Sequence, residues 1–178
     1  MENITIRQAA DNDIEEIKDV VKEAFNRLGK NEYFNEWEFV HKVRSDPGFI
    51  PELCLVAAID EEIVGYLLFS KAVIDKNKGL SLGPLAVKPS YQHKGIGKRL
   101  IDYGLKKAEE DGFEWVALTG GDYYTQFGFE SALKYGIVLS HNHPENPYLK
   151  IKFLNIKREV SGKMKFCESF YDENGELL

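Results

Sequence analysis

The spacing of hydrophobic residues changes repeatedly along the chain and predicts an alternation of strands and helices. Short runs that are continuously apolar, or apolar at every second position, predict strands, whereas apolar residues three or four apart predict helices. Strands are predicted at residues 3–8, 53–60, 61–74, 80–89, 113–119, 148–154 and 162–170. Helices are predicted at 10–29, within 33–46 and at 95–111, followed by a short helix and a turn in 120–132.

The order of these elements predicts an α/β fold. The runs 53–60 and 61–74 are joined by a tight acidic turn and form a predicted hairpin. The strand 80–89, which Gly83-Pro84 interrupts, the helix 95–111 and the strand 113–119 form a βαβ unit, long enough for a right-handed crossover to a parallel strand. Because the sequence shows no repeat, linker or low-complexity segment, we expect one domain over residues 1–178.

Composition and charge restrict the function. The net charge of −6 disfavours broad binding to nucleic acid through phosphate neutralisation. The sequence contains no apolar stretch near the roughly 20 residues that span a bilayer, and its first residues lack the apolar core of a signal peptide. Cys54 and Cys167 lie in apolar, strand-like runs and are expected to be reduced core thiols. We therefore expect a cytoplasmic protein without nucleic-acid or membrane partners.

A basic, glycine-containing stretch, PSYQHKGIGKRL at residues 89–100, marks the corner between a strand and a helix. A helix N-terminus leaves about four N–H groups unpaired and carries roughly half a positive charge. Gly95 and Gly97 let an anion approach this backbone, and Lys94, Lys98 and Arg99 add positive charge. The stretch is therefore interpreted as a cradle for a diphosphate. An ordinary helix start with an exposed basic turn is the alternative.

Two nucleotide-binding motifs fit this stretch incompletely. A P-loop requires glycine where Gln92 stands and a hydroxyl side chain where Arg99 stands. The dinucleotide fingerprint requires a small residue at the position of Leu100. A nucleotide-binding protein thus remains a weakened alternative.

A third pattern fits. Q-x-x-G-x-G, formed by Gln92, Gly95 and Gly97, resembles the acyl-CoA diphosphate loop of the GNAT superfamily of N-acetyltransferases. Upstream, LGPLAVKPSYQ is similar to the family's central strand, and downstream YYTQFGFESA is similar to its aromatic Y-x-x-x-G-F turn, here Tyr124, Gly128 and Phe129. The detailed resemblance covers residues 80–132. It implies a GNAT fold with a mixed central sheet of six to seven strands, splayed at the central strand and flanked by about four helices.

The resemblance also implies a co-substrate, acetyl-CoA, and the residues that hold it. The backbone of the central strand would bond the pantetheine arm, and the amides of the loop would bind the diphosphate. The implied cofactor-binding residues are Leu85, Ala86, Val87, Gln92, His93, Lys94, Gly95, Ile96, Gly97, Lys98 and Phe127. No metal site is expected, because His141 and His143 lack further ligands nearby.

The implied reaction is transfer of the acetyl group to a primary amine by direct attack in a ternary complex. Tyr124 occupies the family position of the general acid, although the helical phase could instead bring Tyr123 to the sulfur. The N–H of Val87 is the expected donor to the oxyanion. Neither cysteine lies in a recognised nucleophile setting, which disfavours a covalent enzyme intermediate.

The general base and the acceptor are not identified by the sequence. The central strand carries no carboxylate before Lys88. The weighed candidates are Asp122, Glu38, His41 and Glu23, together with a water relay. A small amine, a peptide N-terminus and a protein lysine all remain open as acceptors, with the acidic balance favouring a cationic one. A non-catalytic acyl-CoA-binding domain on the same fold is the alternative function. The chain is expected to be a monomer or a homodimer.

Overall fold

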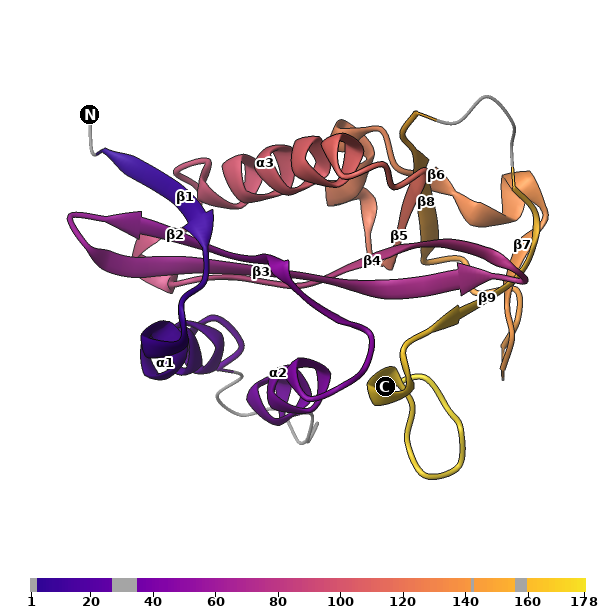
Figure 1. Cartoon of the computed structure of the whole chain (residues 1–178), viewed down its shortest axis with the longest axis horizontal. Coiled ribbons are helices and arrows are strands. Elements are labelled where there is room, and N and C mark those ends of the chain that lie inside the picture. The colour runs from indigo at the N-terminus through magenta and orange to yellow at the C-terminus, as the bar shows by residue number, and fades with distance from the viewer. Residues whose placement is uncertain (1–2, 27–34, 142, 156–159) are drawn as a thin grey trace.

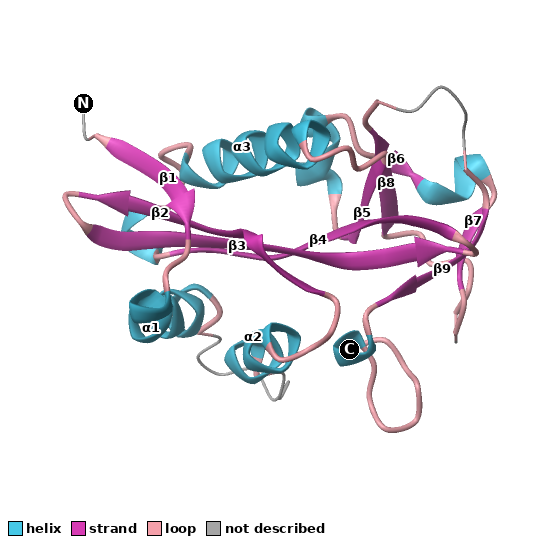
Figure 2. Cartoon of the chain, in the orientation of Figure 1, coloured by secondary structure: helices cyan, strands magenta, loops and turns pink. Residues whose placement is uncertain are grey.

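Nine strands form one mixed sheet in the described part of the chain, with helices on both faces (Figures 1 and 2). The structure, a computed structural model, describes residues 3–26, 35–141, 143–155 and 160–178. The strands are β1 (Ile4–Gln8), β2 (Phe49–Ile59), β3 (Glu62–Ile74), β4 (Asn77–Val87), β5 (Trp115–Thr119), β6 (Glu130–Ser131), β7 (Ile137–Leu139), β8 (Leu149–Phe153) and β9 (Gly162–Phe166). The helices are α1 (Ile14–Ala24), α2 (Glu36–Arg44) and α3 (Ile96–Glu110), with short 3₁₀ helices η1 (Asp11–Asp13), η2 (Pro89–Tyr91), η3 (Asp122–Phe127), η4 (Ala132–Tyr135) and η5 (Glu168–Phe170).

The sheet has a long antiparallel part and a shorter part that joins it through one parallel pairing. Its strand order is β1-β2-β3-β4-β5-β8-β6, and only β4 and β5 run parallel along this path. Strand β9 pairs with the far end of β3, and β7 pairs with β9. Helix α3, which connects β4 to β5, covers one face, whereas α1 and α2 cover the other (Figure 1).

The mixed α/β architecture and all seven predicted strands are confirmed. The structure adds β6 and β7, which are too short to show a period in the sequence. The predicted break at Gly83-Pro84 is wrong, because β4 continues through these residues as one strand. The last predicted strand ends early, at Phe166, and Cys167 precedes η5. Leu28 and Gly29, which were predicted in the first helix, lie outside the described residues.

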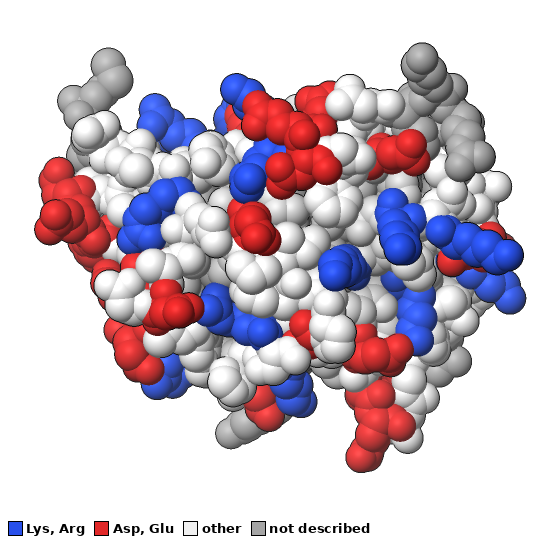
Figure 3. Space-filling view, viewed as in Figure 1, with Lys and Arg blue, Asp and Glu red and all other residues white. Residues whose placement is uncertain are grey.

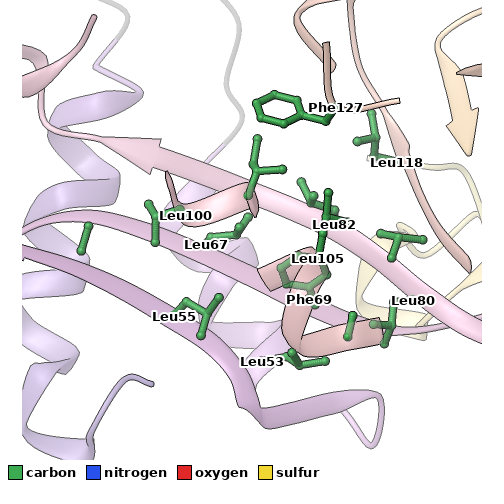
Figure 4. Packing of buried hydrophobic residues seen from close by; sticks show 14 of the residues in the cluster. Leu53, Leu55, Leu67, Phe69, Leu80, Leu82, Leu100, Leu105, Leu118 and Phe127 are labelled. Atoms are coloured by element: carbon green, nitrogen blue, oxygen red, sulfur yellow. The ribbon is translucent and has the colours of Figure 1, made fainter. Parts of the chain in front are cut away.

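The buried hydrophobic residues form three clusters, and alternating side chains of the long strands fill the two that lie on opposite faces of the sheet. On β2 and β3, Leu55 and Leu67 pack toward α3, whereas Val56 and Tyr66 pack toward α1. Helix α3 buries the side chains of Ile96, Leu100, Ile101, Leu105 and Ala108 against the first of these cores. Figure 4 shows Leu100 and Leu105 among the strand residues of this core. Full burial of a leucine or isoleucine side chain contributes about 1.5–3 kcal/mol. This packing fixes α3, and therefore its N-terminus, against the sheet.

Helix α3 approaches the sheet closely at Gly104. A Cβ atom added there would lie 2.4 Å from Cε2 of Phe69 and 3.2 Å from Cδ1 of Leu55. The helix therefore requires glycine at this position for close packing, even though alanine is the better helix former.

The C-terminal segment is tied to the α2 side of the sheet by one carboxylate. Asp46 accepts hydrogen bonds from the N–H of Gly48 at 2.7 Å and from the N–H and hydroxyl of Ser169 at 3.0 and 2.7 Å. Burial by itself raises the pKa of Asp46, but the hydrogen bonds, including one from Cys167, outweigh it and lower the pKa overall. The folded protein therefore favours the charged carboxylate, which links the α2–β2 turn to η5.

Charged side chains are interspersed on the surface. Figure 3 shows lysine and arginine side chains alternating with aspartate and glutamate over one broad face of the molecule. No helix in the described ranges is both long and apolar enough to cross a membrane.

Gly104→Ala is expected to lower the free energy of unfolding by about 1–2 kcal/mol, because overpacking against Phe69 exceeds the gain in helix propensity. Urea unfolding of the two proteins measures this difference. Lys106→Ala, on the exposed side of the same helix, serves as the control and should change stability by less than about 0.5 kcal/mol. An unchanged or raised stability of Gly104→Ala would contradict the close approach.

Asp46→Asn is expected to lower the free energy of unfolding by about 1–3 kcal/mol at pH 7, since bonds to a charged acceptor are lost. A lowered pKa in the folded state contributes stability above the unfolded pKa, and this contribution is lost as pH falls through the folded value. The difference between the two proteins should therefore shrink below about pH 4. Urea unfolding at several pH values measures it, with the exposed Asp19→Asn as the control. A difference that stays constant with pH would count against this role of Asp46.

Candidate functional site

The parallel pair β4–β5 separates partway along the sheet. Among the described residues, the two strands pair only at Leu80 with Val116 and at Ser81 with Ala117. Beyond this point β5 remains paired with β8 through Thr119, and β4 remains paired with β3 through Val87. A gap therefore opens in the middle of the sheet, as the predicted splay requires.

A bulge in β4 lies at the start of this gap. On β3, one residue separates Leu67 from Phe69, but their partners on β4, Leu85 and Leu82, are separated by two residues. The extra residue falls at Gly83-Pro84, where Gly83 has a φ of +132°. Bulges bend a strand and redirect it. The pair that the sequence pattern interprets as a break is thus the point where β4 turns away from β5.

The backbone groups of β4 beyond the bulge point alternately toward β3 and toward the gap. The N–H of Lys88 donates to the carbonyl of Val64 on β3 at 2.9 Å. Since successive backbone groups of a strand face opposite edges, those of Ala86 also point to β3, and those of Leu85 and Val87 point to the gap. Of the three strand residues predicted to bind through their backbone, the geometry therefore directs two to the open edge. Ala86 is directed instead to the neighbouring strand.

The glycine loop follows directly and ends in the N-terminus of α3. Gly95 precedes the helix with a φ of +80°, in the left-handed region that favours glycine. A Cβ atom there would meet nothing within 4 Å. Glycine is therefore favoured at this position by the backbone conformation and not by a lack of space. The first helical bond runs from the N–H of Arg99 to the carbonyl of Gly95 at 3.0 Å. The N–H groups of residues 96–98 therefore precede the helical ladder.

A cavity of about 420 Å³ joins the open strand edge to this helix N-terminus. Its walls come from β4, the glycine loop, the first turn of α3 and η3. The lining residues are Leu85, Val87, Tyr91, Gln92, His93, Gly95, Ile96, Gly97, Lys98, Tyr123 and Gln126. The structure therefore brings most of the sequence-predicted binding residues to one cavity.

A side chain at Gly97 would project into the cavity, whereas a Cβ atom at Gly95 would meet nothing nearby. A Cβ atom at Gly97 would lie 3.2 Å from the hydroxyl of Tyr123 and 3.5 Å from Cδ2 of Leu85, both of which line the cavity. Gln92 holds the loop in place, because its Nε2 donates to the carbonyl of Val87 at 3.0 Å. The two loop positions thus shape the cavity in different ways.

Two lysines stand at the margin of the cavity. The ammonium group of Lys94 lies 5.0 Å from the centre of the Tyr91 ring. That of Lys98 pairs with Asp102 at 2.5 Å and lies 5.8 Å from the centre of the ring of Phe127, which is buried. Both side chains are exposed, so they contribute positive charge without closing the cavity.

The two adjacent tyrosines of η3 differ in environment. Tyr123 lines the cavity and is about half exposed, with 48% of its surface accessible. The ring of Tyr124 packs against Phe129, and a Cβ atom at Gly120 would lie 2.7 Å from it. Burial, and the neighbouring Tyr123, raise the pKa of Tyr124. Tyr124 is thus a partly buried phenol just after the end of β5, and it is not among the residues that line the cavity bordered by Tyr123.

A second cavity, of about 240 Å³, borders the same gap. The bulge residues Gly83 and Pro84 line it, as do Leu118 and Thr119 at the end of β5. Phe25, Phe39, Phe166 and Phe170 contribute rings from the end of α1, α2, β9 and η5. Glu36, in the first turn of α2, contributes the carboxylate, and 8% of its surface is exposed.

Sequence reasoning missed Glu36, although a signal for it exists. In α2 the buried residues are Glu36, Val40 and Val43, which are spaced four and three apart along one stripe of the helix. A carboxylate therefore occupies the first position of an apolar stripe. An acidic residue on the buried side of a helix is uncommon unless it is paired or functional.

The candidate bases weighed from the sequence lie elsewhere. Glu23, Glu38 and His41 are exposed. The carboxylate of Asp122 is fully exposed and lies 3.8 Å from the ammonium of Lys150. Among the described residues that line the second cavity, Glu36 is the one with an acidic side chain.

The cysteines are free thiols in different surroundings. Cys54 is buried and lies 3.1 Å from a guanidinium nitrogen of Arg44, but burial raises its pKa. Burial, with a contribution from Asp46, raises the pKa of Cys167 to about 11. Within the part of the chain that the structure describes, no three His, Cys, Asp or Glu side chains gather as metal ligands would.

Comparison with known proteins gives a consistent set of relatives. A family model described as the acetyltransferase (GNAT) family matches residues 14–129. The chain is 32% identical over 123 residues to the uncharacterised N-acetyltransferase YjhQ of Escherichia coli strain K12. This stretch covers 66% of the chain and 65%, just under two thirds, of that relative.

Two solved structures are similar over nearly the whole chain. One is the GNAT family N-acetyltransferase YhbS of Escherichia coli in complex with CoA. It has a TM-score of 0.83 and 25% identity, and the match covers 96% of this chain and 93% of that one. The other is a GNAT family acetyltransferase from Brucella melitensis in complex with acetyl-CoA. It has a TM-score of 0.76 and 27% identity, with 96% and 99% of the two chains covered.

Proposed function

Because this chain belongs to the acetyltransferase (GNAT) family, we propose that it transfers the acetyl group of acetyl-CoA to a primary amine in a ternary complex. The observation that carries the proposal is the open edge of β4 leading into the glycine loop at the N-terminus of α3. The similar structures with CoA and with acetyl-CoA support the choice of co-substrate.

The pantetheine arm contains two amides, which match the free groups of the strand edge. The N–H and carbonyl of Leu85 would bond one of these amides, so that the arm takes the place of a missing strand, and the N–H of Val87 stays available for the thioester oxygen. The carbonyl of Val87 is already the acceptor for Gln92. An extended arm bound this way would run along β4 toward the loop.

The diphosphate would then lie at the N-terminus of α3. The N–H groups of residues 96–98 face it, and the helix dipole adds a partial positive charge. His93, Lys94 and Gly95 form the approach to this turn, and Ile96 contributes its backbone because its side chain is buried in the core. Lys98 supplies charge, and its ammonium group lies 5.8 Å from the centre of the Phe127 ring.

The acetyl thioester would be placed at the gap between β4 and β5. The amine nitrogen attacks the thioester carbon, and the N–H of Val87 stabilises the oxyanion that forms. Tyr124 then protonates the leaving thiolate as the general acid. Direct transfer agrees with the raised pKa values of both cysteines, which keep them as thiols rather than nucleophilic thiolates.

Gly97→Glu is expected to abolish the binding of acetyl-CoA, because a carboxylate would project into the cavity beside Leu85 and Tyr123. Isothermal titration calorimetry measures the binding of acetyl-CoA to both proteins. We expect a loss of affinity of at least about 100-fold, as a charge placed against a diphosphate is worth several kcal/mol. Gly97 has ordinary helical geometry, so the variant should fold.

Tyr103→Glu introduces the same charge on the exposed side of α3 and should leave binding within about twofold. If wild type bound no acetyl-CoA, or if Gly97→Glu bound it as well as the control, the cavity would not be the cofactor site.

Tyr124→Phe is expected to lower kcat about 100-fold while the affinity for acetyl-CoA stays the same, because only proton donation is removed. Thiol release from acetyl-CoA with a panel of amines measures the rate. Tyr123→Phe removes the neighbouring hydroxyl and should retain most of the activity. A reversal, with Tyr123→Phe inactive and Tyr124→Phe active, would assign the acid role to the tyrosine that lines the cavity.

A further inference from the structure

The ring of Tyr124 lies very close to the backbone that follows β5. Gly120 is the first residue after this strand, and a Cβ atom there would lie 2.7 Å from Cε2 and 2.9 Å from Cδ2 of the ring. It would also lie 3.0 Å from Cδ1 of Leu118. Carbon atoms that are not bonded to each other pack at about 3.5–4.0 Å. The ring therefore occupies space that any larger residue would need at position 120.

The neighbouring Gly121 provides a contrast within the same turn. A Cβ atom there would meet nothing within 4 Å. Neither glycine has a φ in the left-handed region, so alanine can adopt the backbone conformation at both positions. Both glycines also line a third cavity, of about 400 Å³, together with Thr119 and Tyr148. The close contact with Tyr124 is therefore what distinguishes position 120 from position 121.

Packing determines where the Tyr124 ring lies. The ring is edge to face with that of Phe129, with 6.2 Å between the centres, and with that of Tyr123, with 5.3 Å between the centres. Within the described part of the chain, no residue forms a hydrogen bond with the Tyr124 hydroxyl. The hydroxyl is therefore available as a donor, but its position depends on the surfaces that the ring touches.

The backbone of Gly120 is held more firmly than the ring. Its N–H donates to the carbonyl of Tyr148 at 2.9 Å, and the preceding Thr119 pairs with Leu149 of β8. These bonds join the end of β5 to its neighbouring strand. A side chain introduced at position 120 would therefore be accommodated by movement of the Tyr124 ring and not by movement of the strand.

Resting on the proposed function, we infer that Gly120 is a positioning residue for the general acid, because its lack of a side chain lets the Tyr124 ring lie where the phenol can protonate the leaving thiolate. In this step the C–N bond forms as the C–S bond of the thioester breaks, and the tyrosine O–H bond breaks as its proton passes to sulfur. The proton that the amine nitrogen loses restores the phenol. Gly120 itself exchanges no proton.

Gly120→Ala is expected to lower kcat at least about tenfold, since a ring displaced by about 1 Å no longer meets the sulfur in the required geometry. Thiol release from acetyl-CoA measures the rate, with the best substrate among three probe amines: 2-phenylethylamine, spermidine and a lysine-containing peptide. The affinity for acetyl-CoA, measured by calorimetry, should stay within about twofold, because Gly120 is not among the described residues that line the cavity proposed for it. Gly121→Ala is the matched control and should keep kcat within about twofold.

A double variant separates positioning from a structural effect of the substitution. In Tyr124→Phe the hydroxyl is already absent, so adding Gly120→Ala should leave kcat within about twofold of the single variant. A glycine that acted only on the stability of the fold would lower kcat in both backgrounds. Urea unfolding checks that each variant is folded under the conditions of the assay.

Full activity of Gly120→Ala, an equal loss in Gly121→Ala, or a further loss in the double variant would overturn the positioning role while leaving the acetyltransferase function intact. Full activity of Tyr124→Phe would overturn this role together with the general acid. A wild-type protein that binds acetyl-CoA but acetylates none of the three amines would instead contradict the proposed function.

Discussion

The divergence of β4 from β5 is the constraint on which the rest of the site depends. Beyond Ser81 and Ala117 the two strands no longer pair, so the edge of β4 faces a gap in the middle of the sheet. Exposed backbone groups in a sheet normally find a partner. The bulge at Gly83-Pro84 lies where the gap opens. The packing of α3 against the core on its own face of the sheet holds the glycine loop at the end of β4.

Two cavities use this opening in complementary ways. The one bounded by the glycine loop offers backbone N–H groups and a helix N-terminus, which suit an anionic, amide-containing co-substrate. The one bounded by α2 and η5 has largely apolar walls with four phenyl rings, and Glu36 also lines it. Asp46 and its hydrogen bonds to Ser169 hold η5 in this wall, so the tie between distant segments also shapes the second cavity.

The sequence predicts the local features better than those that depend on packing between segments. Hydrophobic period predicts the long strands and helices, and the glycine motif predicts the loop, because both are local patterns. The sequence predicts a break in the strand at Gly83-Pro84, whereas the structure has a bulge, because glycine and proline are common at both features. The direction of the Ala86 backbone depends on its register with β3, which no local pattern reveals. Glu36 joins the lining of the second cavity only through the packing of several segments, although its position on the buried stripe of α2 is a local signal.

Residue-resolved amide hydrogen exchange by NMR, with and without saturating acetyl-CoA, tests the central claim most directly. If the pantetheine arm replaces the missing strand, exchange of the Leu85 and Val87 amides will slow markedly in the complex. The Lys88 amide, already bonded to Val64, will change little. Bound acetyl-CoA that leaves the Leu85 and Val87 amides exchanging as fast as in the free protein would contradict the account.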